Sequence, residues 1–485
     1  MTLSLKNPAL LREAALVGHR WIEANGTGIA VTNPATGDLI GHIPDLGAAE
    51  TQEAIDAAAV AQKEWAKTTA KERSNVLRRW FDLMMANQED LAQILTAEQG
   101  KPLAEARGEV GYGASFLEWF SEEARRAYGD VTPTNTPDKR IITIKQPVGV
   151  TAAITPWNFP NAMITRKAGP AFAAGCAMVL KPSELTPFSA TAMAVLAQEA
   201  GLPSGLFSVI TGDAATIGGV MTSSPTVRKI TFTGSTRVGA MLYEQSAKTI
   251  KKLGLELGGN APFIVFDDAD LDAAVEGAIL SKYRNNGQTC VCANRIYVQA
   301  GVYDAFAEKL AEKVAGMKVG NGAEEGVVFG PLINEAALEK VTNHIADATA
   351  KGADIKLGGK PHEKGGTFFQ PTILTGVTSD MAVATEETFG PVAPLFKFTE
   401  EQEAVDAANA TEFGLASYFY SRDIGRAWRV SEALDYGMVG VNTGHVSTAE
   451  APFGGVKSSG LGREGGYQGL DEFMESKYIC MGSID

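Results

Sequence analysis

The spacing of apolar and polar positions predicts helices in the first part of the chain. From Ala48 to about Tyr128, apolar residues recur every three or four positions in an alanine-rich sequence, which is typical of amphipathic helices. Gly100 and Pro102 interrupt this pattern, since neither residue suits a helix interior. We therefore expect a helical N-terminal layer with a break near residue 100.

After residue 147 the pattern changes to short apolar strands that alternate with helical stretches. Such alternation is typical of parallel crossover units and predicts an α/β fold with a doubly wound sheet. A second series after Gly258 predicts a second α/β domain. Strands are expected at 148–154, 177–180, 206–210, 229–233, 261–266 and 295–298, and helices near 187–200 and 235–245.

The segment 129–147 differs from both regions. It contains Pro133 and Pro137, followed by a β-branched run at 141–144, and therefore predicts an extended segment that leaves the globule. It is either a linker or an interface arm. The tail at 475–480 also has the composition of a strand.

Composition narrows the class of protein. The chain has 485 residues, of which 45% are hydrophobic and 21% charged, and a net charge of −14. These values exclude a disordered or fibrous protein and argue against a surface that binds nucleic acid or anionic lipid. Four cysteines, no secretory signal and prolines in the longest uncharged run (146–165) predict a cytoplasmic protein without a membrane span.

Two glycine-containing segments are candidates for phosphate binding. Gly460, Gly462 and Gly465 have the spacing of a dinucleotide fingerprint but do not follow a strand, so a glycine-rich loop is the better interpretation. Gly234 and Ser235 follow a predicted strand and open a helix, where N–H groups and the helix dipole favour a pyrophosphate. An ordinary strand-to-helix turn is the alternative, because the spacing is not GxGxxG.

The segment from Lys181 through Ser183 to Glu184 ends another predicted strand. Doubly wound sheets bind ligands at this end of their strands. A lysine and a carboxylate three residues apart are suited to hold ribose hydroxyls or a 2′-phosphate. An exposed turn without a ligand is equally consistent with the pattern.

Cys290 and Glu256 are the candidate reactive groups. Cys290 lies in a polar, turn-forming segment before an apolar strand, with Arg284 nearby, which suits a nucleophilic thiol; a buried structural cysteine is the alternative. Glu256 lies between two leucines before a glycine turn, a setting that raises a carboxyl pKa and suits a general base, although a paired carboxylate would look the same. No histidine lies near Cys290 or Cys292, so neither a zinc site nor a local Cys-His dyad is expected.

Together these segments resemble the aldehyde dehydrogenase superfamily, in the same order and over nearly the whole chain. The resemblance implies that Cys290 is the nucleophile, Glu256 the base and Asn158 a donor to the oxyanion. It also implies that Glu387 and Phe389 position the nicotinamide and its ribose. The segments are 155–160, 181–184, 232–235, 255–259, 287–290, 386–391 and 452–457.

The family's chemistry then applies to this chain as an expectation. The thiolate attacks an aldehyde, the thiohemiacetal passes a hydride to NAD or NADP, and water activated by Glu256 hydrolyses the thioester. The further residues expected to bind the coenzyme are Trp157, Lys181, Ser183, Glu184, Gly234 and Ser235.

The family fold implies a division into three parts. A coenzyme-binding domain would comprise 1–128 and 148–256, and a catalytic domain 257–470. A small β extension formed by 129–147 and 471–485 would pair between subunits of a homodimer or homotetramer.

The resemblance is greatest to the succinate-semialdehyde dehydrogenase branch, on segments 163–167, 284–292 and 477–480. In that branch two arginines and a serine hold the distal carboxylate of the substrate, which implies this role for Arg166, Arg284 and Ser447; solvated surface arginines are the alternative. Succinate and glutarate semialdehyde both remain possible substrates. Some branch members also form a regulatory disulfide, which implies a redox partnership between Cys290 and Cys292.

Glu184 bears on the choice of coenzyme. NADP-preferring members often carry a small or neutral residue at this position, and a carboxylate would repel the 2′-phosphate while accepting hydrogen bonds from ribose hydroxyls. NAD, or use of both coenzymes, is therefore favoured. Three other functions stay open: oxidation of another small aldehyde, cysteine-dependent ester cleavage, and a non-catalytic protein on the same fold, although Cys290 and Glu256 are both retained.

Overall fold

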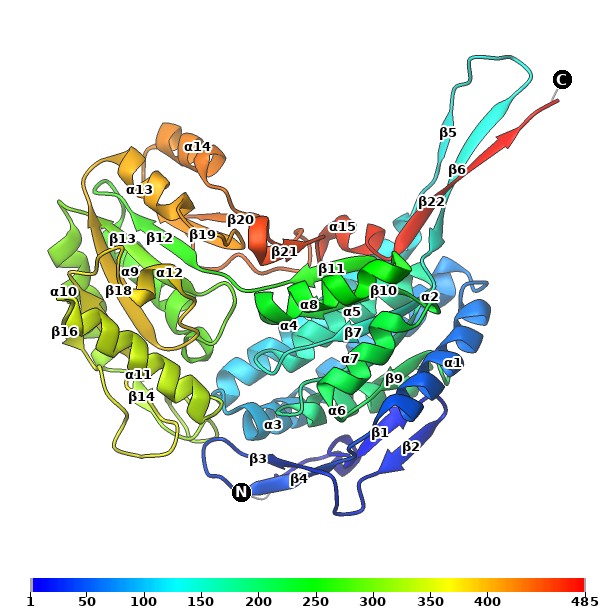
Figure 1. Ribbon diagram of the computed structural model, residues 1–485, viewed down its shortest axis with the longest axis horizontal. Helices are drawn as coiled ribbons and strands as arrows, with labels where there is room; N and C mark the ends of the chain where they lie inside the picture. The colour runs from blue at the N-terminus through cyan, green and yellow to red at the C-terminus, as the bar shows by residue number, and fades with distance from the viewer. Residues whose placement is uncertain (1–2, 484–485) are drawn as a thin grey trace.

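Two large sheets covered by helices form the body of the molecule, and a small three-stranded sheet projects from it (Figure 1). The structure is a computed structural model that describes residues 3–483. It is an α/β fold with mainly parallel sheets, as the sequence predicts. No helix within 3–483 has the length and apolar character needed to cross a membrane.

The first sheet has eight strands in the order β2-β1-β9-β8-β7-β10-β11-β21. The five strands from β9 to β11 are parallel, whereas β1, β2 and β21 are antiparallel to their neighbours. The strands are β1 (Ala14–Val17), β2 (Arg20–Glu23), β7 (Val150–Ile154), β8 (Ala177–Lys181), β9 (Phe207–Val209), β10 (Val227–Thr233), β11 (Lys252–Glu256) and β21 (Gly460–Leu461). The four strands expected between residues 148 and 233 are confirmed; β1, β2 and the β3 (Ile29–Thr32) to β4 (Leu39–Ile43) hairpin had no predicted counterpart.

Helices cover both faces of this sheet. The predicted N-terminal layer consists of α1 (Ala48–Trp65), α2 (Ala70–Ala86), α3 (Gln88–Gln99) and α4 (Leu103–Glu123). Gly100 ends α3 with a φ of 91°, which a glycine adopts without strain, and Pro102 precedes α4. The crossover helices are α5 (Pro160–Ala174), α6 (Pro187–Glu199), α7 (Ala214–Ser223) and α8 (Thr236–Ser246).

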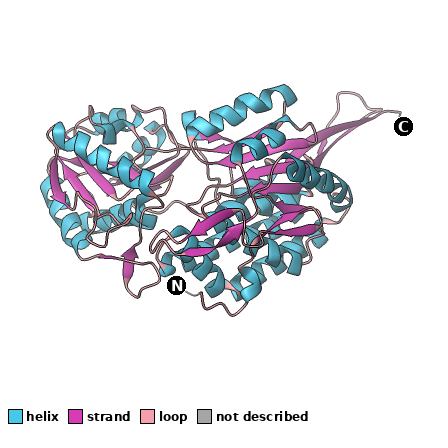
Figure 2. Ribbon diagram, turned by 60° about the horizontal axis from the view of Figure 1, so that its bottom comes forward, coloured by secondary structure: helices cyan, strands magenta, loops and turns pink. Residues whose placement is uncertain are grey.

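The second sheet has seven strands in the order β16-β17-β18-β13-β12-β19-β20, and all but β16 are parallel. Along β12, Phe263 and Val265 join one buried cluster while Ile264 and the next residue after the strand, Phe266, join another, so both faces are covered. Figure 2 shows helices on each side of these strands. The strands are β12 (Ala261–Val265), β13 (Ala293–Gln299), β16 (Asp354–Leu357), β17 (Thr372–Thr375), β18 (Val392–Phe398), β19 (Ala416–Tyr420) and β20 (Met438–Val441), and the helices α9 (Leu271–Tyr283), α10 (Tyr303–Ala315), α11 (Glu335–Ala350), α13 (Glu401–Asn409) and α14 (Ile424–Ala433).

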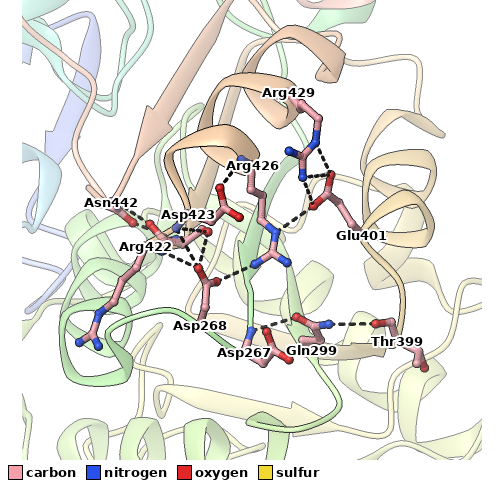
Figure 3. A network of polar contacts seen from close by, with 11 residues as sticks. Asp267, Asp268, Gln299, Thr399, Glu401, Arg422, Asp423, Arg426, Arg429 and Asn442 are labelled. Carbon is pink, nitrogen blue, oxygen red and sulfur yellow. Dashed lines mark hydrogen bonds and ion pairs between the residues drawn. The ribbon is translucent and has the colours of Figure 1, made fainter.

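A network of ion pairs joins the end of β12 to α13 and α14 (Figure 3). Asp268 pairs with Arg426 at 2.7 Å and accepts hydrogen bonds of 2.9 Å from two backbone N–H groups just before α14. Glu401 pairs with both Arg426 and Arg429, at 2.8 and 3.1 Å. The network fixes two surface helices to the sheet through shared charges rather than isolated pairs.

The projecting sheet is formed by β5 (Asp130–Thr132), β6 (Arg140–Pro147) and β22 (Met474–Met481). β6 pairs with β22 over its whole length, from Pro147 opposite Met474 to Arg140 opposite Met481. Both segments predicted to be extended are therefore strands of one arm, which leaves the body beside α2 and carries the C-terminal end of the chain (Figure 1).

Candidate functional site

The candidate residues gather where the strand order of the first sheet reverses. The chain passes from β7 outward to β8 and β9, then returns to the other side of β7 as β10 and β11. Trp157 and Asn158 follow β7, Gly234 and Ser235 follow β10, and Glu256 ends β11. Ligands bind at such a switch point in open α/β sheets, because neighbouring loops diverge there and leave a crevice.

A cavity of about 370 Å³ occupies this position, a volume typical of ligand sites. The second sheet closes it, because β12 begins only five residues after Glu256 and the loop before β13 carries Cys290 into its wall. The site residues that line it are Trp157, Asn158, Gly234, Ser235, Cys290, Glu387 and Phe389. Asn158 and Cys290, which are expected to be catalytic, thus share one cavity with five of the residues expected to bind coenzyme. The cavity is not lined by Glu256, Lys181, Ser183 or Glu184.

Asn158 and the loop of Cys290 are joined by hydrogen bonds. The Asn158 side chain donates to the Gln288 carbonyl at 3.1 Å. Asn285 has a positive φ of 50° and donates from Nδ2 to the carbonyls of both Asn158 and Gln288, at 3.1 and 3.2 Å. These hydrogen bonds hold the Asn158 amide against Gln288, which precedes Cys290 by two residues in the sequence.

A buried ion pair supports Asn158 from the other side. Lys101 donates from Nζ to the Asn158 carbonyl at 2.7 Å and pairs with Glu109, and both charged side chains are buried. Glu109 also accepts a hydrogen bond from the Asn161 N–H at the start of α5, at 2.9 Å. No local pattern identified Lys101 or Glu109, because their partners, Asn158 and Asn161, lie more than 50 residues further along the chain.

The Cys290 thiol is protonated in this environment. Burial raises its pKa to about 12, and the nearby Arg166 guanidinium opposes this rise. Attack by the thiolate therefore needs a group that removes its proton.

Glu256 has the properties of a proton acceptor. Its side chain is buried, and Oε2 has no hydrogen-bond partner among residues 3–483. Burial, together with the negative charge of Glu464, raises the pKa of Glu256 well above its ordinary value. A carboxyl group without stabilising partners takes up a proton readily, as a general base must.

Beside Glu256 lies a charged cluster that sequence reasoning missed. Glu464 pairs with Arg166 at 2.8 Å and with Lys167 at 2.5 Å, and Lys167 also donates to Thr233 Oγ1 at 2.5 Å. The two cations hold the pKa of Glu464 below its usual range, against the effect of burial. Glu464 therefore stays ionised while Glu256 tends toward neutrality.

Arg166 is placed differently from the simplest expectation. Besides the pair with Glu464, its guanidinium lies 3.9 Å from the centre of the Phe453 ring. Its Nε has no hydrogen-bond partner within the described part of the chain. Arg166 lines neither the thiol cavity nor the two spaces that Arg284 lines. One donor of Arg166 thus remains available, whereas most of its charge is matched within the protein.

Arg284 and Ser447 lie outside the thiol cavity. Arg284 lines a second cavity of about 260 Å³, and Phe159 lines both this cavity and the thiol cavity. Its guanidinium lies 4.8 Å from the centre of the Phe159 ring and 3.3 Å from Nδ1 of His445. A small adjoining space is lined by both Arg284 and Ser447, so the structure brings these two expected substrate residues together.

The residues expected to hold the coenzyme fall into two groups. At the end of β8, buried Lys181 forms an ion pair of 2.9 Å with half-exposed Glu184, and Ser183 accepts a hydrogen bond from the Leu185 N–H. Near the thiol, Glu387 accepts a hydrogen bond from the Gly259 N–H at 3.1 Å, and burial raises the pKa of Glu387 to about 7. The Phe389 ring meets Trp157 edge-on at 5.6 Å.

The geometry of this wall fits a dinucleotide. Ser235 caps α8 by accepting a hydrogen bond from the Val238 N–H, so the helix N-terminus lies at the cavity, as anion binding requires. A side chain at Gly234 would meet the Phe232 ring at 2.4 Å, so the strand-to-helix turn needs glycine. The sequence context predicts a loop at the other glycine motif, but its first glycine, Gly460, begins the two-residue strand β21, which pairs with β11.

Cys292 is buried and donates from Sγ to the Lys282 carbonyl at 3.5 Å. All four cysteines are free thiols in the structure, with Cys480 exposed on the arm. The expected partnership of Cys290 and Cys292 stays a prediction.

The chain is similar to known proteins over nearly its whole length. The family model described as "Aldehyde dehydrogenase family" matches residues 21–479. The chain is 63% identical to glutarate-semialdehyde dehydrogenase of Pseudomonas aeruginosa, covering 99% of this chain and 100% of the relative. It is 62% identical to 3-sulfolactaldehyde dehydrogenase of Pseudomonas putida (100% of each chain) and 61% to the NADP(+) succinate-semialdehyde dehydrogenase of Escherichia coli (99% and 100%). A crystal structure of succinate-semialdehyde dehydrogenase from Burkholderia pseudomallei superposes with a TM-score of 0.98 at 63% identity, covering 99% of this chain and 100% of that one.

The raised pKa of Cys290 predicts how its thiol is alkylated in the free protein. Because iodoacetamide reacts with the thiolate, the rate at Cys290 is expected to rise about tenfold per pH unit from pH 7 to pH 10 without reaching a plateau. Peptide mass spectrometry after timed labelling measures this rate. Exposed Cys480 serves as the internal control, and buried Cys176 should stay unlabelled. A plateau at Cys290 below pH 8 would contradict the protonated thiol.

Proposed function

The chain belongs to the aldehyde dehydrogenase family, and from this premise we propose that it oxidises an aldehyde with a distal carboxylate, succinate or glutarate semialdehyde, to the dicarboxylate. The observation that carries the proposal is the position of Arg284, in a cavity that shares the lining residue Phe159 with the thiol cavity. An aldehyde with its reactive carbon at Cys290 and its far end beside Arg284 would place opposite charges together. The aldehydes named for the three relatives all bear an anionic group, which supports the same preference.

In the proposed reaction, Glu256 would take the proton of the Cys290 thiol and pass it to solvent, and the thiolate would attack the aldehyde carbon to form a thiohemiacetal. The free N–H of the Asn158 amide and the Cys290 backbone N–H would stabilise the negative oxygen, because Asn158 is held in place before the reaction. When bound, NAD or NADP supplies the acceptor for the hydride that leaves the thiohemiacetal. Glu256 would then take a proton from the water that hydrolyses the thioester.

Arg166 would act in this reaction through its Nε and through its positive charge near Cys290. Its Nε is a buried donor without a partner in the described chain, and its positive charge lowers the pKa of Cys290. We assign it to the substrate site together with Arg284 and Ser447. Its pairing with Glu464 limits how much positive charge it can offer a second carboxylate.

The coenzyme would extend from Glu387, Phe389 and Trp157 along the β10 turn toward Lys181. At that end the carboxylate of Glu184 already pairs with Lys181, which leaves less positive charge for a 2′-phosphate. We therefore propose NAD, or both coenzymes, while noting that the Escherichia coli relative is named for NADP(+).

The arm formed by β5, β6 and β22 would pair with another copy of the chain to form a dimer or tetramer. β22 lies at the edge of its sheet, and its side chains are mostly exposed. A long strand with an unpaired edge is suited to bind a second chain. The domain limits given above and a cytoplasmic location belong to the same proposal.

Replacing Arg284 by alanine tests the substrate assignment. Arg284 is partly buried, and removal of its cation from a bound carboxylate is expected to cost about 2–5 kcal/mol in transition-state binding. Steady-state kinetics of Arg284→Ala with succinate semialdehyde, glutarate semialdehyde and butanal should show a large fall in kcat/KM for the two anionic aldehydes and a small one for butanal.

Arg107→Ala is the matched control, because Arg107 is half-exposed and pairs with Glu89 outside both cavities. It should leave all three rates unchanged. Equal losses on anionic and uncharged aldehydes in Arg284→Ala would rule out a carboxylate site at Arg284.

Replacing Glu184 by serine tests the coenzyme assignment. The change removes a negative charge and frees Lys181, so the ratio of kcat/KM for NADP to that for NAD is expected to rise about tenfold or more. Initial rates at fixed aldehyde concentration measure the ratio. Glu199→Ser, an exposed change at the end of α6, should leave it unchanged. If Glu184→Ser also leaves the ratio constant, these residues do not contact the ribose.

Oxidation by peroxide tests the cysteine pair. The Cys290 thiol would become a sulfenic acid with release of water, and attack by the Cys292 thiol would release a second water and form a disulfide. Reversible inactivation is expected, with recovery in dithiothreitol and a bridged peptide in mass spectra, and Cys292→Ala should lose this recovery. A Cys290 sulfenate that never yields the bridged peptide would exclude the pair.

A further inference from the structure

Tyr112 lies on α4 with its ring in the wall of the Arg284 cavity. The ring packs against Phe159, Ala162 and Met163, and it meets Phe116 edge-on at 5.1 Å. These contacts hold the ring from several sides without using its oxygen. The position of the hydroxyl is therefore fixed by packing and does not depend on a hydrogen bond.

The hydroxyl of Tyr112 is buried and has no hydrogen-bond partner among residues 3–483. Leaving a buried hydroxyl unpaired is unfavourable, so such groups in native proteins usually have a partner or a function. Burial and the charge of Glu464 raise the pKa of Tyr112, whereas the guanidiniums of Arg166 and Arg284 and a contact with the Ser447 hydroxyl lower it. Tyr112 thus lies among the three groups assigned to the substrate carboxylate.

The other polar groups of this cavity are already engaged. Glu109 pairs with Lys101, and Glu105 accepts a hydrogen bond from the Asn285 N–H at 2.8 Å. His445 contacts Arg284 through Nδ1. Within the described part of the chain, the Tyr112 hydroxyl is therefore an unpaired donor on a residue that lines the same cavity as Arg284.

We propose that Tyr112 is a specificity-determining residue whose hydroxyl donates a hydrogen bond to the distal carboxylate of the aldehyde. The inference rests on the proposed function and adds a neutral donor to the two arginines. A carboxylate has about four lone-pair sites, so it can accept from the hydroxyl and from a guanidinium at once. Because the ring is held by apolar contacts, its hydroxyl keeps one position, and the groups that cover the hydroxyl must shift for a carboxylate to reach it.

The substitution Tyr112→Phe isolates this hydrogen bond, since it keeps the ring and its packing and removes only the oxygen. We expect kcat/KM for succinate or glutarate semialdehyde to fall about 10- to 100-fold, as for loss of a hydrogen bond to a charged group, with less than a twofold change for butanal. The affinity for the product dicarboxylate, measured by calorimetry, should fall in parallel. Tyr303→Phe is the control: it removes another buried hydroxyl, which bonds to the Leu395 carbonyl in the second sheet, and should not alter the ratio between aldehydes.

The outcomes separate this inference from the function on which it rests. If Arg284→Ala loses the preference for anionic aldehydes and Tyr112→Phe retains it, the role of Tyr112 is wrong and the proposed substrate class stands. If the unmodified enzyme oxidises butanal as efficiently as succinate and glutarate semialdehyde, the proposed function itself is wrong. Equal losses of Tyr112→Phe on all aldehydes would show a structural role and overturn the inference.

Discussion

The site depends on one set of buried hydrogen bonds around Asn158. Its side chain donates to the Gln288 carbonyl, and its own carbonyl accepts from Lys101 and Asn285. These bonds join the loop after β7, in the first sheet, to the loop before β13, in the second. Without them the oxyanion donor and the thiol would lie on separate loops with independent positions. Buried polar networks of this kind are costly to disrupt, because each broken bond leaves an unpaired group away from water.

A second constraint sets the charges around the reacting atoms. Two carboxylates, Glu256 and Glu464, are buried in one region with two cations, Arg166 and Lys167. Both cations contact Glu464, which therefore remains ionised, while Glu256 receives no such contact and its pKa rises. Different partners thus give two chemically identical side chains different proton affinities, and the higher affinity of Glu256 suits the carboxylate that must accept a proton from its ionised form.

Phe159 lies between the thiol cavity and the cavity lined by Arg284. Its ring borders both cavities, with the thiol of Cys290 on one side and Arg284 on the other, and the Lys101 ammonium lies 3.8 Å from its centre. An apolar partition of this kind fixes the distance between the reactive carbon of a substrate and its charged end. Phe159 directly precedes α5 and packs on α4, so its position is fixed by the core. A fixed Phe159 would select substrates by their length.

Local order in the sequence determined much of the fold. The helical layer before residue 128, the parallel strands of the first sheet and the extended arm segments all follow from periodicity and from glycine and proline positions, because these depend on near neighbours. Cys290, Glu256 and Gly234 were identifiable from their short motifs for the same reason. Tertiary structure alone decided which groups meet: Glu464 reaches Lys167 across 297 residues, Lys101 reaches Asn158 across 57, and Tyr112 lines the same cavity as Arg284. Such contacts arise from how the sheets and helices pack, and pairing between distant residues leaves no periodic signal along the chain.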